Sequence, residues 1–202
     1  MPDILDCGAG GMFVRADYPD YEEEFDLDCR YEISESLRVG TRKIVASEAL
    51  PETLVLRTRK KSLPDSFMTL NGMKVFSARA ITIIEELDPG VHQFFPIKII
   101  YKNGESFHLQ GYKIGHFFTK KKSLDVSRPS IGRYANGALH TVLIRDYPIY
   151  FHATSLAGPN LWREEGFKDG LFSSDILQAR MKSEKLRFFK PERKSVVLEQ
   201  TP

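Results

Sequence analysis

An α+β fold is predicted for this chain: two related units, each a helix with an antiparallel sheet, together with a strand-rich N-terminal segment. Two serine-capped helix patterns and several short β-rich runs bounded by turn residues predict it. The two helical stretches also resemble each other, because each opens with Phe-Ser and is followed by a Phe-Phe pair. So short a pattern has two explanations. It can be a coincidence, or it can reflect a repeated helix-and-strand unit that would bury each helix on its own sheet.

The N-terminal part, residues 1–65, is expected to form short strands and turns, and residues 66–202 contain both predicted helices. We expect the two parts to form one continuous globular unit, because a chain of 202 residues suits a single domain. The candidate strands of the first part are Met12–Ala16, Arg30–Ile33, Lys43–Ser47 and Thr53–Arg57.

The first helix has the clearest pattern in the sequence. Ser77 suits its N-cap position, since the serine hydroxyl can accept a hydrogen bond from a free backbone amide of the first turn. Asp88-Pro89-Gly90 ends it, because proline cannot continue a helix and glycine accepts a positive φ. The apolar stripe between these two signals has helical spacing and consists of Ala80, Ile83, Ile84 and Leu87.

A β-hairpin is predicted directly after the first helix. Its first strand is the apolar run Phe94–Tyr101, and Lys102-Asn103-Gly104 carries the Asn-Gly signal of a tight turn. Phe107–Phe118 is the expected returning strand.

A second helix is predicted near the C-terminus. Ser173 is its expected N-cap, and the helix is expected to run through Ile176, Leu177 and Met181 to about Lys185, with a less regular apolar stripe than the first helix. A strand, Leu186–Lys190, is expected to follow it.

The composition is that of a globular protein, with 42% hydrophobic and 28% charged residues. The N-terminus lacks the basic and apolar stretches of a secretory signal, and no apolar run reaches the roughly 18 to 20 residues that span a bilayer. We therefore expect a cytoplasmic protein that does not enter a membrane. Two reduced thiols, Cys7 and Cys29, are expected in that compartment, while a single disulfide between them stays open.

Charge is distributed unevenly along the chain. Residues 1–35 hold eleven carboxylates and two arginines, a net charge of −9, which leaves +11 for the rest of a chain whose total is +2. Within the loop Asp17–Asp28, seven carboxylates alternate with aromatic residues, a pattern that suits contact with a basic groove as well as it suits a solvated loop. The candidate binding residues are Tyr18, Asp20, Tyr21, Glu22, Glu23, Glu24 and Asp26.

The basic residues have a simpler interpretation. The stretch Arg180–Lys194 is expected to be a solvated helix face rather than a nucleic-acid contact, because cations near a helix C-terminus are favoured by the helix dipole. Lys120-Lys121-Lys122 is expected to be a hairpin or loop end. Nucleic acid is therefore not an expected partner.

No catalytic or cofactor site is predicted. The sequence contains no G-x-S-x-G elbow, and Gly8–Gly11 does not match a phosphate-binding loop. On one continuous strand, His108 and His116 would be about 26 Å apart, too far to share a metal ion. We expect no catalytic residues, no metal and no cofactor.

The region of about residues 70–191 resembles a bacterial immunity family, immunity protein family eleven. In its central block, a serine-capped helix with Glu85-Glu86-Leu87 near its end leads to an F-F-P strand, Phe94-Phe95-Pro96, and then to a hairpin. The C-terminal block of that family also matches, with a Gly and a Leu-Phe before a serine-capped helix and a strand that ends near proline. Its matching positions here are Gly170, Leu171-Phe172, Ser173, Phe188 and Pro191.

This resemblance implies an immunity protein, or antitoxin, that binds and inhibits a cognate secreted toxin domain in the cytoplasm of the producing cell. The resemblance also implies that the toxin is encoded beside this chain, and a toxin gene immediately upstream would favour inhibition. Such toxins serve competition between bacteria, are often delivered by contact-dependent or type VI secretion, and many are nucleases. The resemblance implies no catalytic residues. Two other functions stay open from the sequence: a hydrolase that reverses a toxin's modification, and a nucleic-acid-binding accessory protein. The sequence leaves the oligomeric state undetermined.

Overall fold

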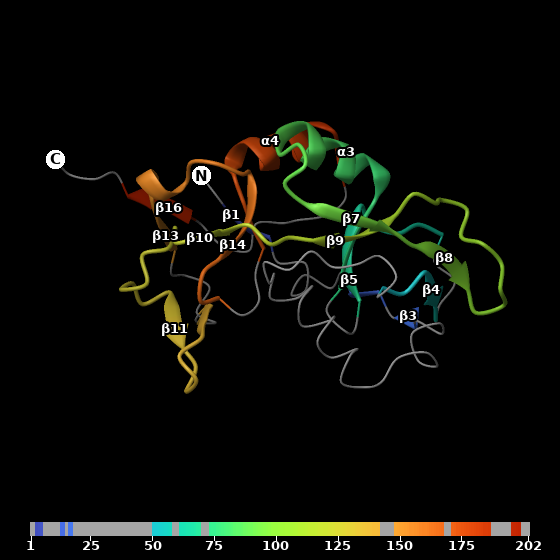
Figure 1. The fold of residues 1–202 in the computed structure, drawn as a ribbon, viewed down its shortest axis with the longest axis horizontal. Coiled ribbons are helices and arrows are strands. Elements are labelled where there is room, and N and C mark those ends of the chain that lie inside the picture. Colours follow the sequence, from blue (N-terminus) through green and yellow to red (C-terminus); the bar gives the residue numbers. More distant parts are fainter. Residues whose placement is uncertain are drawn as a thin grey trace.

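Two short helices, α3 (Ala78–Leu87) and α4 (Asp175–Ser183), lie side by side along one side of the strands (Figure 1). The computed structural model describes residues 3–5, 13–14, 16–17, 50–57, 61–69, 73–141, 148–167, 171–186 and 195–198. Within these residues the strands form five small sheets. The predicted α+β class is thereby confirmed.

Helix α3 begins and ends where the sequence predicts. The Ser77 hydroxyl accepts a hydrogen bond from the Ala80 amide at 3.3 Å and donates one to the Asp65 carboxylate at 2.7 Å. Asp88 is the C-cap, and Gly90 follows with a φ of +66°. Of the predicted apolar stripe, Ala80, Ile83 and Ile84 are buried and Leu87 is partly buried, so the stripe does face the interior.

Helix α4 begins one residue later than predicted, because Ser174 and not Ser173 is its N-cap. The Ser174 hydroxyl accepts a hydrogen bond from the Leu177 amide at 3.1 Å. Ser173 belongs instead to the preceding strand, where it pairs with Asp3 on one side and Leu161 on the other. The pairing of Ser173 in a sheet therefore moves the helix start to the next serine.

Two sheets share the long segment that follows α3. The five-stranded sheet has the order β2 (Phe13–Val14), β5 (Ser66–Thr69), β6 (Lys74–Phe76), β9 (Lys113–His116) and β7 (Gln93–Pro96). The three-stranded sheet has the order β3 (Ala16–Asp17), β4 (Thr53–Leu56) and β8 (Lys98–Tyr101). β4 lies within the predicted strand Thr53–Arg57, and the predicted strand Met12–Ala16 corresponds to β2 and the start of β3.

The remaining strands belong mostly to the C-terminal half. A four-stranded sheet has the order β1 (Asp3–Leu5), β15 (Leu171–Ser173), β14 (Leu161–Glu164) and β10 (Lys120–Lys121). Two separate pairs are β11 (Ile131–Arg133) with β12 (Leu139–Thr141) and β13 (Ile149–His152) with β16 (Ser195–Leu198), and a 3₁₀ turn spans Ala153–Ser155. The predicted strands Arg30–Ile33 and Lys43–Ser47, and Leu186–Lys190 beyond its first residue, lie outside the described residues.

The predicted hairpin after α3 is only partly correct. The turn is present, with a φ of +84° at Gly104 and a hydrogen bond from the Gly104 amide to the Tyr101 carbonyl at 2.9 Å. The returning strand is much shorter than predicted, because the Gln110 side chain replaces a strand beside Ile99. Its amide nitrogen donates to the Ile99 carbonyl at 3.1 Å, and its oxygen accepts from the Ile99 amide at 3.4 Å.

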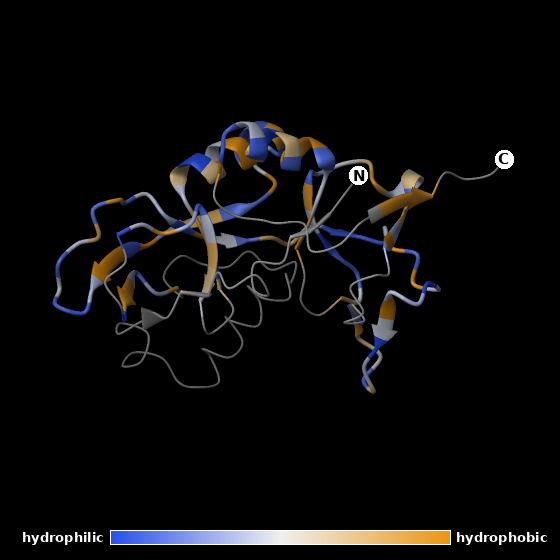
Figure 2. Cartoon of the chain, turned by 180° about the vertical axis from the view of Figure 1, so that it is seen from behind, coloured by the Kyte–Doolittle hydropathy of each residue, from blue (hydrophilic) through white to orange (hydrophobic). Residues whose placement is uncertain are grey.

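The two helices share one apolar cluster, which also contains side chains from the five-stranded and the four-stranded sheets. This cluster joins side chains of α3, such as Ile84, to Leu177 and Met181 of α4 and to Leu161 and Leu171 beneath them. Figure 2 shows hydrophobic and hydrophilic residues side by side along both helices, as expected when only one face is buried. The relation between the two helix-and-sheet units stays a prediction.

No helix in the described part of the chain is long and apolar enough to cross a membrane.

Candidate functional site

A groove lies where the chain after α3 passes from β7 of the five-stranded sheet to β8 of the three-stranded sheet. β4 runs parallel to β8, with Thr53 beside Lys98, and the Lys98 amide donates to the Glu52 carbonyl at 2.8 Å. Two steps further in this register, Pro51 would lie beside Pro96. Neither proline has an amide hydrogen to donate, so the ladder stops there.

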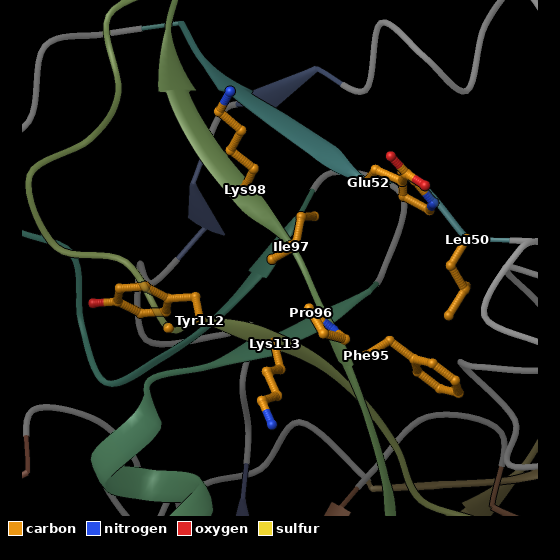
Figure 3. A pocket seen from close by; sticks show the side chains of 10 residues that line it. Leu50, Glu52, Phe95, Pro96, Ile97, Lys98, Tyr112 and Lys113 are labelled. Carbon is orange, nitrogen blue, oxygen red and sulfur yellow. The ribbon is translucent and has the colours of Figure 1, made fainter.

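The opposite wall of the groove comes from β9. β7 pairs with β9 as far as Pro96 beside Lys113, and the Ile97 amide then donates to the Tyr112 carbonyl at 3.2 Å. Ile97 is therefore held between the two sheets. The open groove beside it has a volume of about 600 Å³ (Figure 3) and is lined by Leu50, Pro51, Glu52, Phe95, Pro96, Ile97, Lys98, Gly111, Tyr112 and Lys113.

The groove combines an apolar floor with a charged rim. Leu50, Phe95, Ile97 and Tyr112 of the floor are buried members of the hydrophobic cluster beneath it, so their positions are fixed by the core. Glu52 and Lys98 are exposed and Lys113 is half-buried. Among the described residues, none of these three charged side chains has an ion-pair or hydrogen-bond partner. Such a floor and rim can bind an apolar side chain that has charged neighbours.

The acidic loop predicted as a binding site lies outside the described residues, including Tyr18, Asp20, Tyr21, Glu22, Glu23, Glu24 and Asp26. The residue before it is described: Asp17 ends β3 and pairs with Val55 of β4. Because β3 and β4 are antiparallel, the chain at Asp17 is directed toward the end of β4 where Glu52 and the groove lie. The role of the loop in binding stays a prediction.

Glu164 is a buried carboxylate on β14, and the described contacts explain it as a structural group. It accepts hydrogen bonds from the Ser123 hydroxyl at 2.6 Å and from the Leu124 amide at 3.0 Å. Burial raises the pKa of Glu164, and these hydrogen bonds offset only part of that rise. Its oxygens are therefore occupied in joining β14 to the segment after β10.

Lys121 is the neighbouring buried cation, on β10. Its ammonium donates hydrogen bonds to the Leu156 carbonyl at 2.9 Å and to the Pro159 carbonyl at 2.7 Å, and it lies 4.2 Å from the centre of the Trp162 ring. Burial lowers the pKa of Lys121, although the carboxylates of Asp88 and Glu164 act in the opposite direction. The expectation that Lys120–Lys122 forms a hairpin or loop end is wrong for residues 120 and 121, because they form a strand that pairs in parallel with β14.

Glu164, Lys121 and their hydrogen-bond partners lie outside the groove, since none of these residues lines it. The described residues include no group of three or more His, Cys, Asp or Glu side chains placed to hold a metal ion. His116 is buried in β9 whereas His108 is exposed outside any strand, so the two do not share one continuous strand. The groove is therefore a candidate contact surface within the part of the chain that the structure describes.

Comparison with known families agrees with the resemblance noted in the sequence. A family model described as "Immunity protein family (Imm11)" matches residues 12–194, which include both helices and the groove. No curated protein matches the chain. Because the match covers nearly the whole sequence, this chain belongs to the Imm11 immunity protein family.

Proposed function

We propose that this chain binds a cognate secreted bacterial toxin domain in the cytoplasm of the producing cell and blocks its activity. The family match over residues 12–194 carries this proposal. The protein would act by stoichiometric occlusion, without turnover and without a cofactor. A toxin delivered by contact-dependent or type VI secretion is the expected partner.

The acidic loop from Tyr18 to Asp28 is the proposed contact for a nuclease toxin. A nuclease needs a basic cleft to hold phosphates, and the carboxylates of Asp20, Glu22, Glu23, Glu24 and Asp26 carry the complementary charge. Tyr18 or Tyr21 would add a rigid aromatic anchor, the kind of residue that contributes most to interface affinity. The −9 charge of residues 1–35 supports this assignment.

Co-expression with the product of the adjacent upstream gene tests the proposal. Cells that express that protein's C-terminal domain alone should stop growing, and cells that also express this chain should grow and yield a complex that co-purifies. A matched control is an unrelated toxin domain, against which this chain should give no protection. Continued growth arrest in the presence of soluble, folded chain would refute the proposal.

A further inference from the structure

We infer that the groove at Pro96–Ile97 receives an extended segment of the toxin domain in which an apolar side chain lies between two acidic residues. The inference rests on the proposed function and identifies a contact that is separate from the acidic loop. It follows from three properties of the groove: its fixed apolar floor, its two lysines and its interrupted backbone ladder.

The floor favours an apolar side chain. Leu50, Phe95, Ile97 and Tyr112 belong to the core cluster that also contains Leu54 and Ile99. Because the core holds these side chains in place, a partner would bind without the entropic cost of ordering them. A volume of about 600 Å³ lies in the range that accommodates a few side chains of a bound segment.

The two lysines of the rim favour acidic neighbours on both sides of that apolar residue, whereas Glu52, which Figure 3 shows on the Leu50 side of the groove, disfavours a further acidic residue there. Figure 3 shows Lys98 and Lys113 on opposite sides of Pro96 and Ile97. Within the described part of the chain, neither lysine has an acidic partner that would be displaced on binding. Charge complementarity therefore points to carboxylates at both ends of the bound segment.

The interrupted ladder determines how the segment would bind. Pro96 lies in the edge strand β7 of the five-stranded sheet, and a proline cannot donate a hydrogen bond to an added strand. Adding a strand through this position would leave a backbone carbonyl without a partner. The bound segment would therefore be held by its side chains, with its specificity set by the order acidic, apolar, acidic.

Charge reversal in the groove tests the assigned chemistry. The probe is the purified C-terminal domain encoded upstream, with its Kd measured by calorimetry at two salt concentrations. Lys98→Glu combined with Lys113→Glu should weaken binding about tenfold or more, because like charges across an interface are strongly unfavourable. The matched control is Lys102→Glu, an exposed lysine in the turn after β8 that does not line the groove, and it should change Kd less than about twofold.

A photo-crosslinking residue at Pro96 gives an independent readout in a chain that keeps both lysines. It should crosslink the toxin domain within an acidic, apolar, acidic segment identified by mass spectrometry, while the same residue at Lys102 should not. Equal Kd values for the groove and control variants, or full binding without a crosslink at position 96, would overturn the inference and leave the proposed function intact. No binding by the unaltered chain would refute both.

Discussion

Asp88 and Asn160, which are 72 positions apart in the sequence, are joined by two hydrogen bonds at the junction of the two helices. The Asp88 carboxylate accepts one from the Asn160 backbone amide at 2.8 Å and one from its side-chain amide at 2.9 Å. The Asn160 side chain in turn accepts a hydrogen bond from the Ser174 hydroxyl at 2.7 Å. This chain of contacts links the end of α3 through the start of β14 to the beginning of α4.

Asp88→Asn should destabilise the fold by about 2–4 kcal/mol, because an amide cannot accept all the hydrogen bonds that the buried carboxylate accepts. The carboxylate also accepts from the Leu161 amide at 2.9 Å and contacts His92 at 3.3 Å. Chemical denaturation at neutral pH measures the effect. Asp175→Asn is the control, since Asp175 is exposed at the start of α4. Equal losses in the two variants would contradict this assignment.

The contribution of Asp88 should also depend on pH. Burial raises its pKa, but hydrogen bonds from His92, Asn160 and Leu161 outweigh burial and hold the pKa below the ordinary value of 3.8. The stability from the ionised carboxylate is therefore complete above 3.8 and is lost as the pH falls through the lowered folded-state value. The difference in unfolding free energy between the unaltered chain and Asp88→Asn should shrink below about pH 4. A constant difference would count against the lowered pKa.

Ser174→Ala should cost about 1–2 kcal/mol, because it removes both the cap of α4 and the hydrogen bond to Asn160. Ser183→Ala, at the exposed end of the same helix, serves as the control and should cost less. Denaturation midpoints of the two variants decide the comparison. A larger loss from Ser183→Ala would mean that Ser174 does not cap the helix.

Gly115→Ala should destabilise the chain by about 1–3 kcal/mol through overcrowding of the core. A Cβ atom at Gly115 would lie 2.7 Å from the ring of Phe117 and 2.9 Å from that of Phe76, both fully buried. Gly132→Ala places its Cβ equally close to the His140 ring, but that ring is only half-buried and can move aside. Thermal melting should therefore show a larger decrease for Gly115→Ala, and the reverse order would contradict the packing argument.

Replacing Glu22, Glu23 and Glu24 with lysine should slow association with a nuclease toxin and make the rate less sensitive to salt, because rim charges act mainly on encounter. Tyr21→Ala should instead speed dissociation, since a buried aromatic anchor acts after docking. Surface-binding kinetics separate the two effects. If the triple variant binds with unchanged rates and still protects cells, the loop does not form the interface.

Local signals allowed α3 to be predicted from the sequence. Its cap Ser77, its apolar stripe and its stop at Asp88-Pro89-Gly90 all lie within one short stretch. The start of α4 was misplaced because two serines are adjacent, and the choice between them depends on the pairing of Ser173 with Asp3 and Leu161. Such pairing between distant residues leaves no periodic pattern around the serines themselves.

The groove and the buried charges also depend on pairing between distant residues, so they could not be predicted from the sequence. The groove depends on Pro51 lying near Pro96, which follows from the register of β4 on β8. Lys121 and Glu164 occur in the charged runs Lys120–Lys122 and Glu164–Glu165, which resemble solvated surface until β10 pairs with β14. The family resemblance, in contrast, depended on order and residue type along the chain, and it was confirmed.

Titration of the toxin domain's activity with this chain tests the central claim most directly. Stoichiometric occlusion predicts that the activity of the upstream-encoded domain falls linearly and reaches zero at one equivalent of this chain, with no further loss over time. Full toxin activity at a large excess of folded chain would contradict inhibition by binding. Complete loss of activity at far less than one equivalent, increasing with time, would show that the chain acts as an enzyme instead.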